Sequence, residues 1–346
     1  MSVSVNNKNG SDTANIIDTD KEDEIRVSIC CITYNQEQYI AQTLESFLMQ
    51  KADFKYEILI NDDASTDNTA NIIREYEKKY PDIIKPIYQK QNQYSRGVTN
   101  PSGAFNYPRA KGRYTAMCEG DDYWTDEYKL KKQVDFLEKH KDCSLCFHAA
   151  KNLPVDGSFT NSTVRPYNES RFISTEEVID KNSAYPTASL IFRSCFTRRM
   201  PDYYTSCPVG DIPLQLHLAA NGSVYYMDEV MSVYRIGDKV SWSVLMKQGD
   251  YEKKQEDYYN QMQIMYEEFN KTTCGRYTDY VNNAIKRLRF LTYVNTKKYD
   301  RIFNQEYARF YKELDLRTRF FTKFEYRLPF LYNMVRIIIG TVQDVA

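Results

Sequence analysis

The sequence predicts an α/β fold with a mostly parallel sheet flanked by helices and a helical appendage at the carboxyl end. From Ile25 to about residue 150, short apolar runs rich in β-branched residues alternate with stretches of helical periodicity. This alternation implies parallel strands joined by right-handed crossovers. From Asp250 onward, long helical patterns without internal glycine or proline take over. We therefore expect a first domain over residues 25–245 and a helical region over residues 250–346.

The predicted elements follow one another in a regular order. The predicted strands cover residues 27–33, 56–60, 83–88, 114–117 and 186–193. The predicted helices cover residues 36–50, 67–79, 104–110, 174–180, 251–270, 277–294 and 299–314, with others starting near Asp126 and at Asp211. Pro81 ends the second of these helices because proline cannot continue a helix.

Length and charge narrow the class of protein. With 346 residues, 42% of them hydrophobic and 27% charged, the chain can bury a full core. A net charge of −1 gives no reason to expect a nucleic-acid partner. Residues 1–24 are polar and contain no apolar segment of a secretory signal. They predict a disordered tail and a cytoplasmic protein whose eight cysteines are reduced.

Polar side chains follow three predicted strands at the point where each strand ends. Thr33-Tyr34-Asn35 follows the first, Asp62-Asp63 the second and Asp121-Asp122 the fourth. Parallel strands bring these ends to one edge of the sheet, where open α/β sheets bind ligands. Carboxylates there can accept from a base or ribose and can hold Mg²⁺ or Mn²⁺ on a diphosphate. A single acidic pair is also explained by an exposed turn that caps the next helix.

Nucleotide binding of two common kinds is disfavoured. The sequence contains neither a Gly-x-Gly-x-x-Gly turn nor a Gly-x-x-x-x-Gly-Lys loop. Dinucleotide-dependent oxidoreductases and P-loop NTPases use these motifs to cradle phosphates. The polar strand ends therefore predict a different site for a nucleotide diphosphate.

Four segments together resemble the family 2 glycosyltransferases of GT-A fold, a Rossmann-like architecture. They are Val27–Asn35, Asn61–Asp67, Ala110–Tyr114 and Cys118–Trp124, and the resemblance weakens beyond residue 150. It implies an inverting, hexosyltransferase-type transfer from a nucleotide diphosphate sugar, usually UDP-linked. It also implies a divalent metal, Mn²⁺ or Mg²⁺, and a place in bacterial surface polysaccharide synthesis.

The resemblance implies roles for individual residues. Asp121 and Asp122 match the family's metal-binding motif, whose usual first Asp is Glu119 here, and Asp121 also faces the donor. Asp62 and Asp63 match the pair that holds base and ribose. The remaining donor-binding residues are expected to be Thr33, Tyr34, Asn35, Glu37 and Arg235.

The segment around Arg235 resembles the family loop that closes over the donor diphosphate. Gly237 occupies the position where the family carries a histidine. Arg235 or Lys239 can supply positive charge in its place, and a plain surface loop is the alternative for Lys239.

Asp211 is the candidate catalytic base. It starts a helix just ahead of Pro213, where an acidic residue is ordinary capping chemistry. An inverting transferase, however, needs a carboxylate to take the proton from the acceptor hydroxyl. The surroundings of Asp211 resemble the place where the family carries that base, which favours the catalytic role.

Three further residues are candidate sugar or acceptor contacts. Trp124 and Trp242 can stack on a sugar ring, with burial in the core as the alternative. His217 lies about two turns into the helix that starts at Asp211, so we expect it to pack or to line the acceptor wall.

The carboxyl end interleaves basic and aromatic residues. Arg317, Arg319, Lys323, Arg327 and Arg336 alternate with residues that include Phe320, Phe321, Phe324, Phe330, Tyr332 and Ile337 to Ile339. This pattern predicts either binding to the inner face of the cytoplasmic membrane or packing on the protein or another copy of it. Membrane binding would suit a lipid-linked glycan acceptor. This carboxyl-terminal stretch is too short and too charged to span a bilayer.

Two functions of other classes remain open from the sequence. A non-catalytic nucleotide-sugar sensor would bind the donor without turnover. A scaffold protein of a polysaccharide assembly complex would use the helical region and bind no donor. Acidic residues at each expected position favour the enzyme over both.

Overall fold

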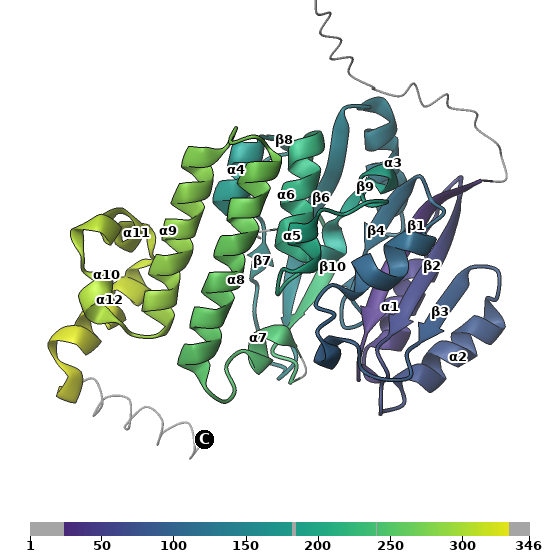
Figure 1. The fold of residues 1–346 in the computed structure, drawn as a ribbon. Coiled ribbons are helices and arrows are strands. Elements are labelled where there is room, and N and C mark those ends of the chain that lie inside the picture. The colour runs from purple at the N-terminus through teal and green to yellow at the C-terminus, as the bar shows by residue number, and fades with distance from the viewer. Residues whose placement is uncertain (1–23, 182–184, 240, 332–346) are drawn as a thin grey trace, which may run out of the picture.

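A computed structural model describes residues 24–181, 185–239 and 241–331 of the chain (Figure 1). The strands are β1 Ile25–Thr33, β2 Lys55–Asp62, β3 Ile84–Tyr88, β4 Tyr114–Met117, β5 Tyr123–Trp124, β6 Cys143–Pro154, β7 Thr163–Val164, β8 Arg171–Ile173, β9 Ile191–Arg193 and β10 Ser223–Ile236. The α-helices are α1 Ile40–Leu48, α2 Thr69–Lys79, α3 Lys129–Lys139, α4 Thr175–Lys181, α5 Asp202–Thr205, α6 Asp211–Asn221, α7 Trp242–Leu245, α8 Tyr251–Thr272, α9 Thr278–Asn295, α10 Tyr299–Ile302, α11 Ala308–Glu313 and α12 Leu316–Arg327. The expected tail over residues 1–24 lies outside the described residues except for Glu24.

One sheet organises the fold. Its strand order is β3-β2-β1-β4-β9-β6-β10-β5, with β7 added to β6 and β8 to β10. Strands β3, β2, β1 and β4 are parallel neighbours, as the sequence predicts. Strand β9 runs antiparallel to both β4 and β6, and β6 pairs in parallel with β10. The α/β fold class is confirmed, and the antiparallel β9 joins its two parallel parts.

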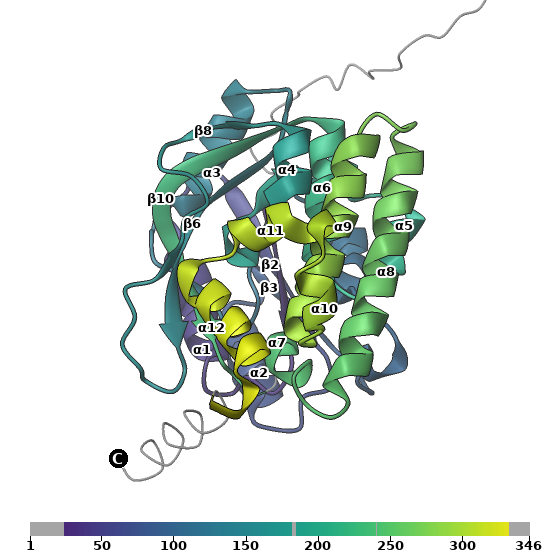
Figure 2. The same ribbon diagram turned by 90° about the vertical axis from the view of Figure 1, so that its left-hand side faces the viewer.

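Helices cover both faces of the sheet and create two cores. Alternation in β1 directs Ile29 to a core shared with α1, α2 and α3, and Cys30 to the core on the other face. This second core contains side chains of α4, α6, α8 and α9, among them Tyr266 of α8. In Figures 1 and 2, α8 and α9 lie beside α6 and α4. The first two helices of the carboxyl region therefore pack into the main core, while the boundary at residues 245–250 stays a prediction.

The prediction of one continuous helix over residues 299–314 is wrong. It is split into α10, a short 3₁₀ turn over Gln305–Tyr307, and α11. Asn304 takes an extended conformation, and its side chain accepts a hydrogen bond from the backbone N–H of Glu306. Asparagine competes with helix continuation in this way because its side chain can cap a new turn. Within the described residues, no helix is long and apolar enough to cross a membrane.

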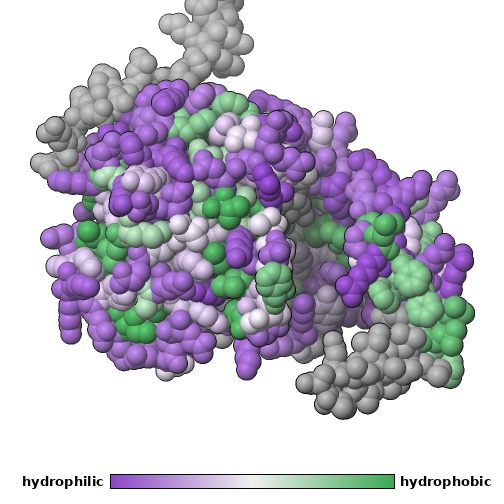
Figure 3. All heavy atoms as spheres, turned by 180° about the vertical axis from the view of Figure 1, so that it is seen from behind, coloured by the Kyte–Doolittle hydropathy of each residue, from purple (hydrophilic) through white to green (hydrophobic). Residues whose placement is uncertain are grey.

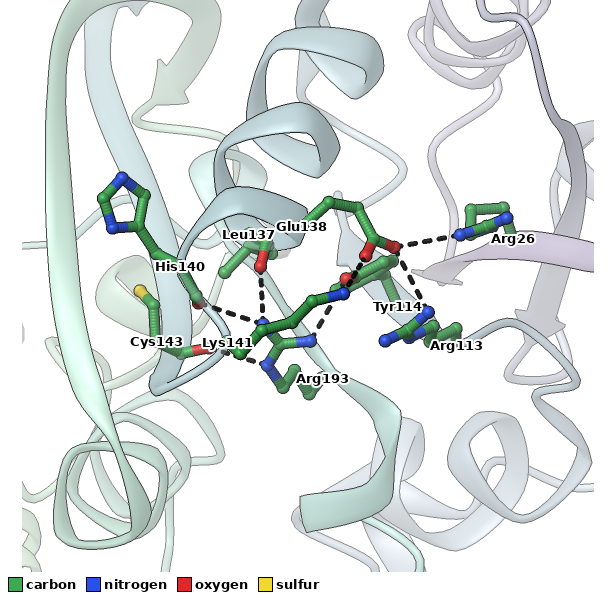
Figure 4. Close-up of polar contacts among 9 residues, drawn as sticks. All are labelled: Arg26, Arg113, Tyr114, Leu137, Glu138, His140, Lys141, Cys143 and Arg193. Atoms are coloured by element: carbon green, nitrogen blue, oxygen red, sulfur yellow. Dashed lines mark hydrogen bonds and ion pairs between the residues drawn. The ribbon is translucent and has the colours of Figure 1, made fainter. Parts of the chain in front are cut away.

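A buried arginine ties the sheet to α3 at the end of the strands where β1 begins. Arg193 of β9 donates to the carbonyl oxygens of Leu137, His140 and Cys143 at 2.6, 3.1 and 2.8 Å, and to the hydroxyl of Tyr114 at 3.1 Å (Figure 4). The carbonyls of Leu137 and His140 lie at the end of α3, where helix carbonyls lack intrahelical partners. One guanidinium therefore satisfies the helix end and joins three elements.

Beside Arg193, Glu138 forms ion pairs with three basic side chains. Its carboxylate lies 2.9 Å from Arg26, 2.9 Å from Lys141 and 3.5 Å from Arg113 (Figure 4). These pairs connect α3 to β1 and to the start of β4. Because these ion pairs are partly exposed, each one contributes little to the free energy of unfolding.

We expect Arg193→Leu to lower the free energy of unfolding by about 2–4 kcal/mol, because it leaves buried carbonyl groups without donors. Urea denaturation measures the change. Arg198→Leu is the matched control, since Arg198 is exposed and its loss should change stability by about 0.5 kcal/mol or less. Equal stability of the two variants would contradict the role given to Arg193.

Candidate active site

The acidic loop over residues 118–122 lies against the end of β1. Thr33 pairs with Asp62 in register, and the backbone N–H of Gly120 donates to the carbonyl of Ile32 at 2.9 Å. A Cβ atom on Gly120 would lie 2.4 Å from the amide oxygen of Gln36 and 2.7 Å from Thr33. Only glycine fits this close approach. The ends of β1, β2 and β4 thus meet at one edge, as the sequence predicts.

Thr43 of α1 holds this loop from beneath. Its buried hydroxyl lies 2.9 Å from the carbonyl oxygen of Gly120 and 2.7 Å from that of Asp122. A single hydroxyl proton is shared between these acceptors. The loop therefore takes its shape from a side chain on a neighbouring helix.

Arg235, near the end of β10, clamps the loop from the other side. Its backbone N–H donates to Oδ1 of Asp122 at 2.9 Å, and its guanidinium donates to the carbonyl of Asp121 and the side chain of Gln42. The guanidinium also lies over the rings of Tyr39 and Tyr123, 4.5 and 4.8 Å from their centres. Arg235 is thus a buried support of the acidic loop. Its contact with a donor stays a prediction.

The carboxyl groups of the loop are protonated more easily than isolated acids. Burial and the neighbouring acids Asp121 and Asp211 raise the pKa of Glu119 to about 8. Burial and the charge of Asp238 raise the pKa of Asp121 to about 6, and burial raises that of Asp122 well above its ordinary value. Desolvation and mutual repulsion both disfavour the charged forms. A cation between these groups would relieve that repulsion.

Asp211 is close enough to the acidic loop for its charge to act on Glu119. It is the first residue of α6, and its charge contributes to the raised pKa of Glu119 and of Tyr234 in β10. Burial raises the pKa of Asp211, while the backbone N–H groups of Asp211 and Ile212 counteract this shift. A carboxylate at a helix start is favoured by the helix dipole. The fold therefore brings an acid from α6 to the edge that carries the acidic loop.

The residues of this edge fit a divalent cation that also binds a substrate. Among the residues that the structure describes, no three His, Cys, Asp or Glu side chains form a ready-made metal cluster. Mg²⁺ sites, however, commonly use one or two carboxylates and complete the coordination with substrate phosphates. Oδ2 of Asp122 is buried and accepts no hydrogen bond, while Glu119 and Asp121 are half-buried. This donor set suits such a shared site.

The acids at the end of β2 have different surroundings. Oδ1 of Asp62 is buried without a hydrogen-bond partner, and burial raises the pKa of this carboxyl. Both oxygens of Asp63 accept backbone N–H groups, from Gln93 at 2.7 Å and from Tyr94 at 3.0 Å. Asp62 is thus available to a ligand, whereas Asp63 shapes the loop after β3.

Two of the expected donor-binding residues connect loops. Oδ1 of Asn35 accepts from the backbone N–H of Thr66 at 2.8 Å, and the carboxylate of Glu37 accepts from that of Asn68 at 2.7 Å. Asn35 adopts a positive φ of 52°. These bonds join the loop after β1 to the loop after β2. Tyr34, in the loop after β1, is half-buried.

The expected sugar contact at Trp124 is wrong. Trp124 is only 1% exposed, packs on Phe47 with ring centres 4.7 Å apart, and donates its indole N–H to the carbonyl of Ala188 at 2.8 Å. The alternative of burial in the core is correct, because the β5 strand turns this ring inward. A sugar cannot reach it.

His217 and Trp242 occupy different settings. Nε2 of His217 lies 2.9 Å from the carbonyl of Phe196, which fits packing rather than a free acceptor contact. Trp242 is 37% exposed and lies against Tyr258 of α8, with ring centres 5.4 Å apart. The charge of Asp211 contributes to the raised pKa of Tyr258, which places this aromatic pair near the candidate base. Trp242 keeps its predicted role as a possible sugar contact.

Gly237 has a conformational reason for replacing the family's histidine. Its φ is +93°, in the left-handed region where side chains with a Cβ are strained. A histidine at this position would require a different path of the loop after β10.

Sequence reasoning missed several residues of the site. Thr43, Gln36, Tyr234 and Tyr258 all lie at or beneath the acidic edge. Thr43 and Gln36 belong to the helix and loop after β1, and their residue types carry no signal of contact with the acidic loop. Tyr258 lies on α8, where nothing in the sequence pattern indicates proximity to Asp211.

The fold is that of an α/β protein whose parallel strands end at an acidic edge. Residues 28–201, half of the chain, match the model of glycosyl transferase family 2. The chain therefore belongs to glycosyl transferase family 2. The predicted family is confirmed.

Relatives and solved structures agree with this family and fold. A protein named Rv1520 from Mycobacterium tuberculosis is 37% identical over 214 residues, 60% of this chain and 58% of that protein. TuaG of Bacillus subtilis, whose name assigns it provisionally to teichuronic acid biosynthesis as a glycosyltransferase, is 28% identical over 272 residues, 75% of this chain and 96% of that protein. The chain thus spans little more than half the length of its mycobacterial relative.

Two solved structures share the fold at low sequence identity. The structure of S. aureus TarS is similar with a TM-score of 0.55 and 17% identity, over 85% of this chain and 50% of that one. The mannosyltransferase PcManGT from Pyrobaculum calidifontis, solved with GDP-Man and Mn²⁺, gives a TM-score of 0.54 and 14% identity, over 93% of this chain and 87% of that one. At such identities the similarity establishes the GT-A fold alone.

We expect Thr43→Val to lower the free energy of unfolding by about 1–3 kcal/mol, because the buried carbonyls of Gly120 and Asp122 lose their donor. Thr43→Ser keeps the hydroxyl and serves as the control. Urea denaturation compares the two. Because valine keeps the methyl group and loses only the hydroxyl, wild-type stability of the valine variant would contradict the support assigned to the hydrogen bonds.

Proposed function

We propose that this protein is an inverting glycosyltransferase that moves a sugar from a nucleotide diphosphate donor, a UDP-sugar, to a glycan acceptor. The observation that carries the proposal is the gathering of Glu119, Asp121 and Asp122 at the edge where β1, β2 and β10 end, with Asp211 at the start of α6 close enough for its charge to act on Glu119. A donor diphosphate at the loop and an acceptor hydroxyl at Asp211 would meet at the sugar's anomeric carbon. The names of relatives such as TuaG support a setting in bacterial surface polysaccharide synthesis.

The donor would be held by residues of three strand ends. Asp62 has a buried oxygen free to accept from the base or ribose, and Thr33 lies beside it in register. The loop that Asn35 and Glu37 hold together would enclose the nucleotide. Arg235 contributes positive charge from behind the acidic loop. These contacts fix the diphosphate at the edge where the carboxylates converge.

Asp121 and Asp122, with Glu119 as neighbour, would hold the cation, Mn²⁺ or Mg²⁺. When bound, this metal acts as a Lewis acid that stabilises negative charge on the leaving diphosphate. Asp121 is the more accessible of the pair, because Asp122 is 1% exposed and one of its oxygens is already bonded to Arg235. The mannosyltransferase of similar fold was solved with Mn²⁺, which supports a metal of this kind.

Asp211 would act as the general base. Its burial raises the carboxyl pKa, which makes the carboxylate a better proton acceptor than an exposed aspartate. Removal of the acceptor proton allows the hydroxyl oxygen to attack the anomeric carbon from the face opposite the diphosphate. A single displacement of this geometry inverts the anomeric centre. Tyr258 and Trp242 form an aromatic wall near Asp211 on which an acceptor sugar can stack.

The acceptor that best suits the protein is a glycan, free or linked to a lipid at the inner face of the cytoplasmic membrane. A lipid-linked acceptor would explain the basic and aromatic residues of the carboxyl end. Association of two copies stays a prediction for the same surface.

We expect Asp211→Asn to reduce sugar transfer by about 10²–10⁴-fold, because the amide cannot take the acceptor proton. Donor affinity, measured by calorimetry, should change by no more than about twofold. Asp202→Asn is the matched control, since Asp202 also begins a helix but is exposed. Transfer by Asp211→Asn at nearly the wild-type rate would remove Asp211 from the role of base.

We expect Asp121→Asn to weaken binding of a UDP-sugar in Mn²⁺ by at least about tenfold, and to leave binding in EDTA unchanged. Calorimetry with a panel of nucleotide sugars measures this and names the donor. Asp122→Asn tests the second proposed ligand, and the exposed Asp82→Asn is the control. Metal dependence that survives in both site variants contradicts the metal assignment. Donor binding without turnover by the wild type would favour the sensor, and no donor binding the scaffold.

A further inference from the structure

Helix α12 presents large apolar side chains to solvent. Leu316 is 77% exposed and Phe320 is 63% exposed, and no residue of the helix is buried. Just beyond the helix, Phe330 is 74% exposed and Leu331 is 46% exposed. Isolated apolar residues on a surface are ordinary, but a contiguous group of this size on one element marks a contact surface.

The helix attaches to the protein largely through polar groups and ring edges. Glu325 pairs with Lys297 at the end of α9, with 2.6 Å between the charged atoms. The hydroxyl of Tyr311 donates to the carbonyl of Arg319 at 2.9 Å. Tyr326 packs on Tyr299, with ring centres 5.6 Å apart. Tyr326 also packs on Phe303, with ring centres 4.9 Å apart. The contacts that attach α12 are thus polar and aromatic, and they leave Leu316 and Phe320 exposed.

The exposed Leu316 and Phe320 share one side of the helix. They follow one another at an interval of four, and the half-buried Phe324 continues the row at the same interval. The rings of Phe320 and Phe324 stack with centres 5.8 Å apart. Figure 3 shows hydrophobic residues gathered at this end of the molecule, next to the last described residues.

The exposed charges within α12 are positive, and one exposed acid, Asp315, precedes the helix. Arg317, Lys323 and Arg327 are exposed on or beside the apolar row. The two acids of the segment are engaged with the protein, since Glu325 pairs with Lys297 and Asp315 caps the start of the helix. A chain of net charge −1 therefore carries a locally basic and apolar surface.

We propose that α12 and the residues up to Leu331 form a surface that binds in the plane of an anionic lipid bilayer. Apolar rings and leucines would enter the headgroup region, and arginine and lysine would meet the lipid phosphates. A second copy of the chain fits less well. Two-fold pairing would bring the same basic residues against one another. The basic and aromatic pattern of the sequence continues in Tyr332, Arg336 and Ile337 to Ile339, which lie outside the described residues.

The position of α12 agrees with this role. In Figures 1 and 2, α12 lies toward the same lower end of the molecule as α7, the helix that begins with Trp242. A bilayer bound to α12 would therefore lie on the same side of the molecule as the candidate acceptor wall of Trp242 and Tyr258. The surface itself is argued from α12 alone and does not rest on the proposed transferase activity.

Flotation of the full chain with vesicles tests the proposal. Vesicles of phosphatidylcholine alone are compared with vesicles containing 30% phosphatidylglycerol, at low and high salt and without any donor. We expect at least about tenfold tighter binding to the anionic vesicles, lost in high salt. The double variant L316S/F320S and the double variant R317E/K323E should each lose binding by about tenfold or more.

Matched controls separate this surface from general effects. Phe159→Ser removes an 87% exposed phenylalanine from the β6–β7 connection, and Lys271→Glu reverses an exposed charge on α8. Neither should change vesicle binding, and circular dichroism checks that each variant is folded. Absence of wild-type binding, or equal loss in the controls, overturns the proposal. So does a dimer, seen by light scattering, that L316S/F320S dissociates while vesicles are not bound.

Discussion

The crowding of three carboxyl groups, one buried and two half-buried, in one short loop is the constraint on which the site depends. Glu119, Asp121 and Asp122 lie at the end of β4 and have raised pKa values because burial and mutual repulsion disfavour their charges. Such a loop keeps its shape only if its backbone is fixed independently of the carboxylates. Thr43 supplies that support from α1, and Arg235 supplies it from β10. Repulsion left over between the acids is what makes the edge receptive to a cation.

The mixed order of the sheet explains how distant segments reach this loop. The antiparallel β9 separates β4 from β6, and β10 pairs in parallel with β6 before its end meets β5. That path delivers Arg235 to the acidic loop, and α6, which precedes β10, delivers Asp211. Helix α8 then packs on α6 and brings Tyr258 beside Asp211. The carboxyl region therefore contributes to the candidate acceptor side as well as to the core.

Much of the first half of the fold could be predicted, since each strand and helix there has its own hydrophobic period and its own end signals. The site was predictable only in part. Trp124 and Asp63 have the residue types of ligand contacts but turn into the core and into a loop. Thr43 has no distinctive residue type and matters through its position beneath the loop. The sequence predicted one helix over residues 299–314, but the helix ends before Asn304, because the Asn304 side chain caps a new turn.

The sequence by itself determined the family, the parallel direction of strands β1 to β4 and the edge that carries Asp62 and Asp121. Alternation and period decide which face of an element is buried, and parallel crossovers decide which strand ends meet. Only the tertiary structure decided that Asp211 comes close to Glu119, that Trp124 is buried, and that Leu316 and Phe320 of α12 are exposed. Each of these depends on packing between segments far apart in the chain, and no local pattern records which surface another segment will cover.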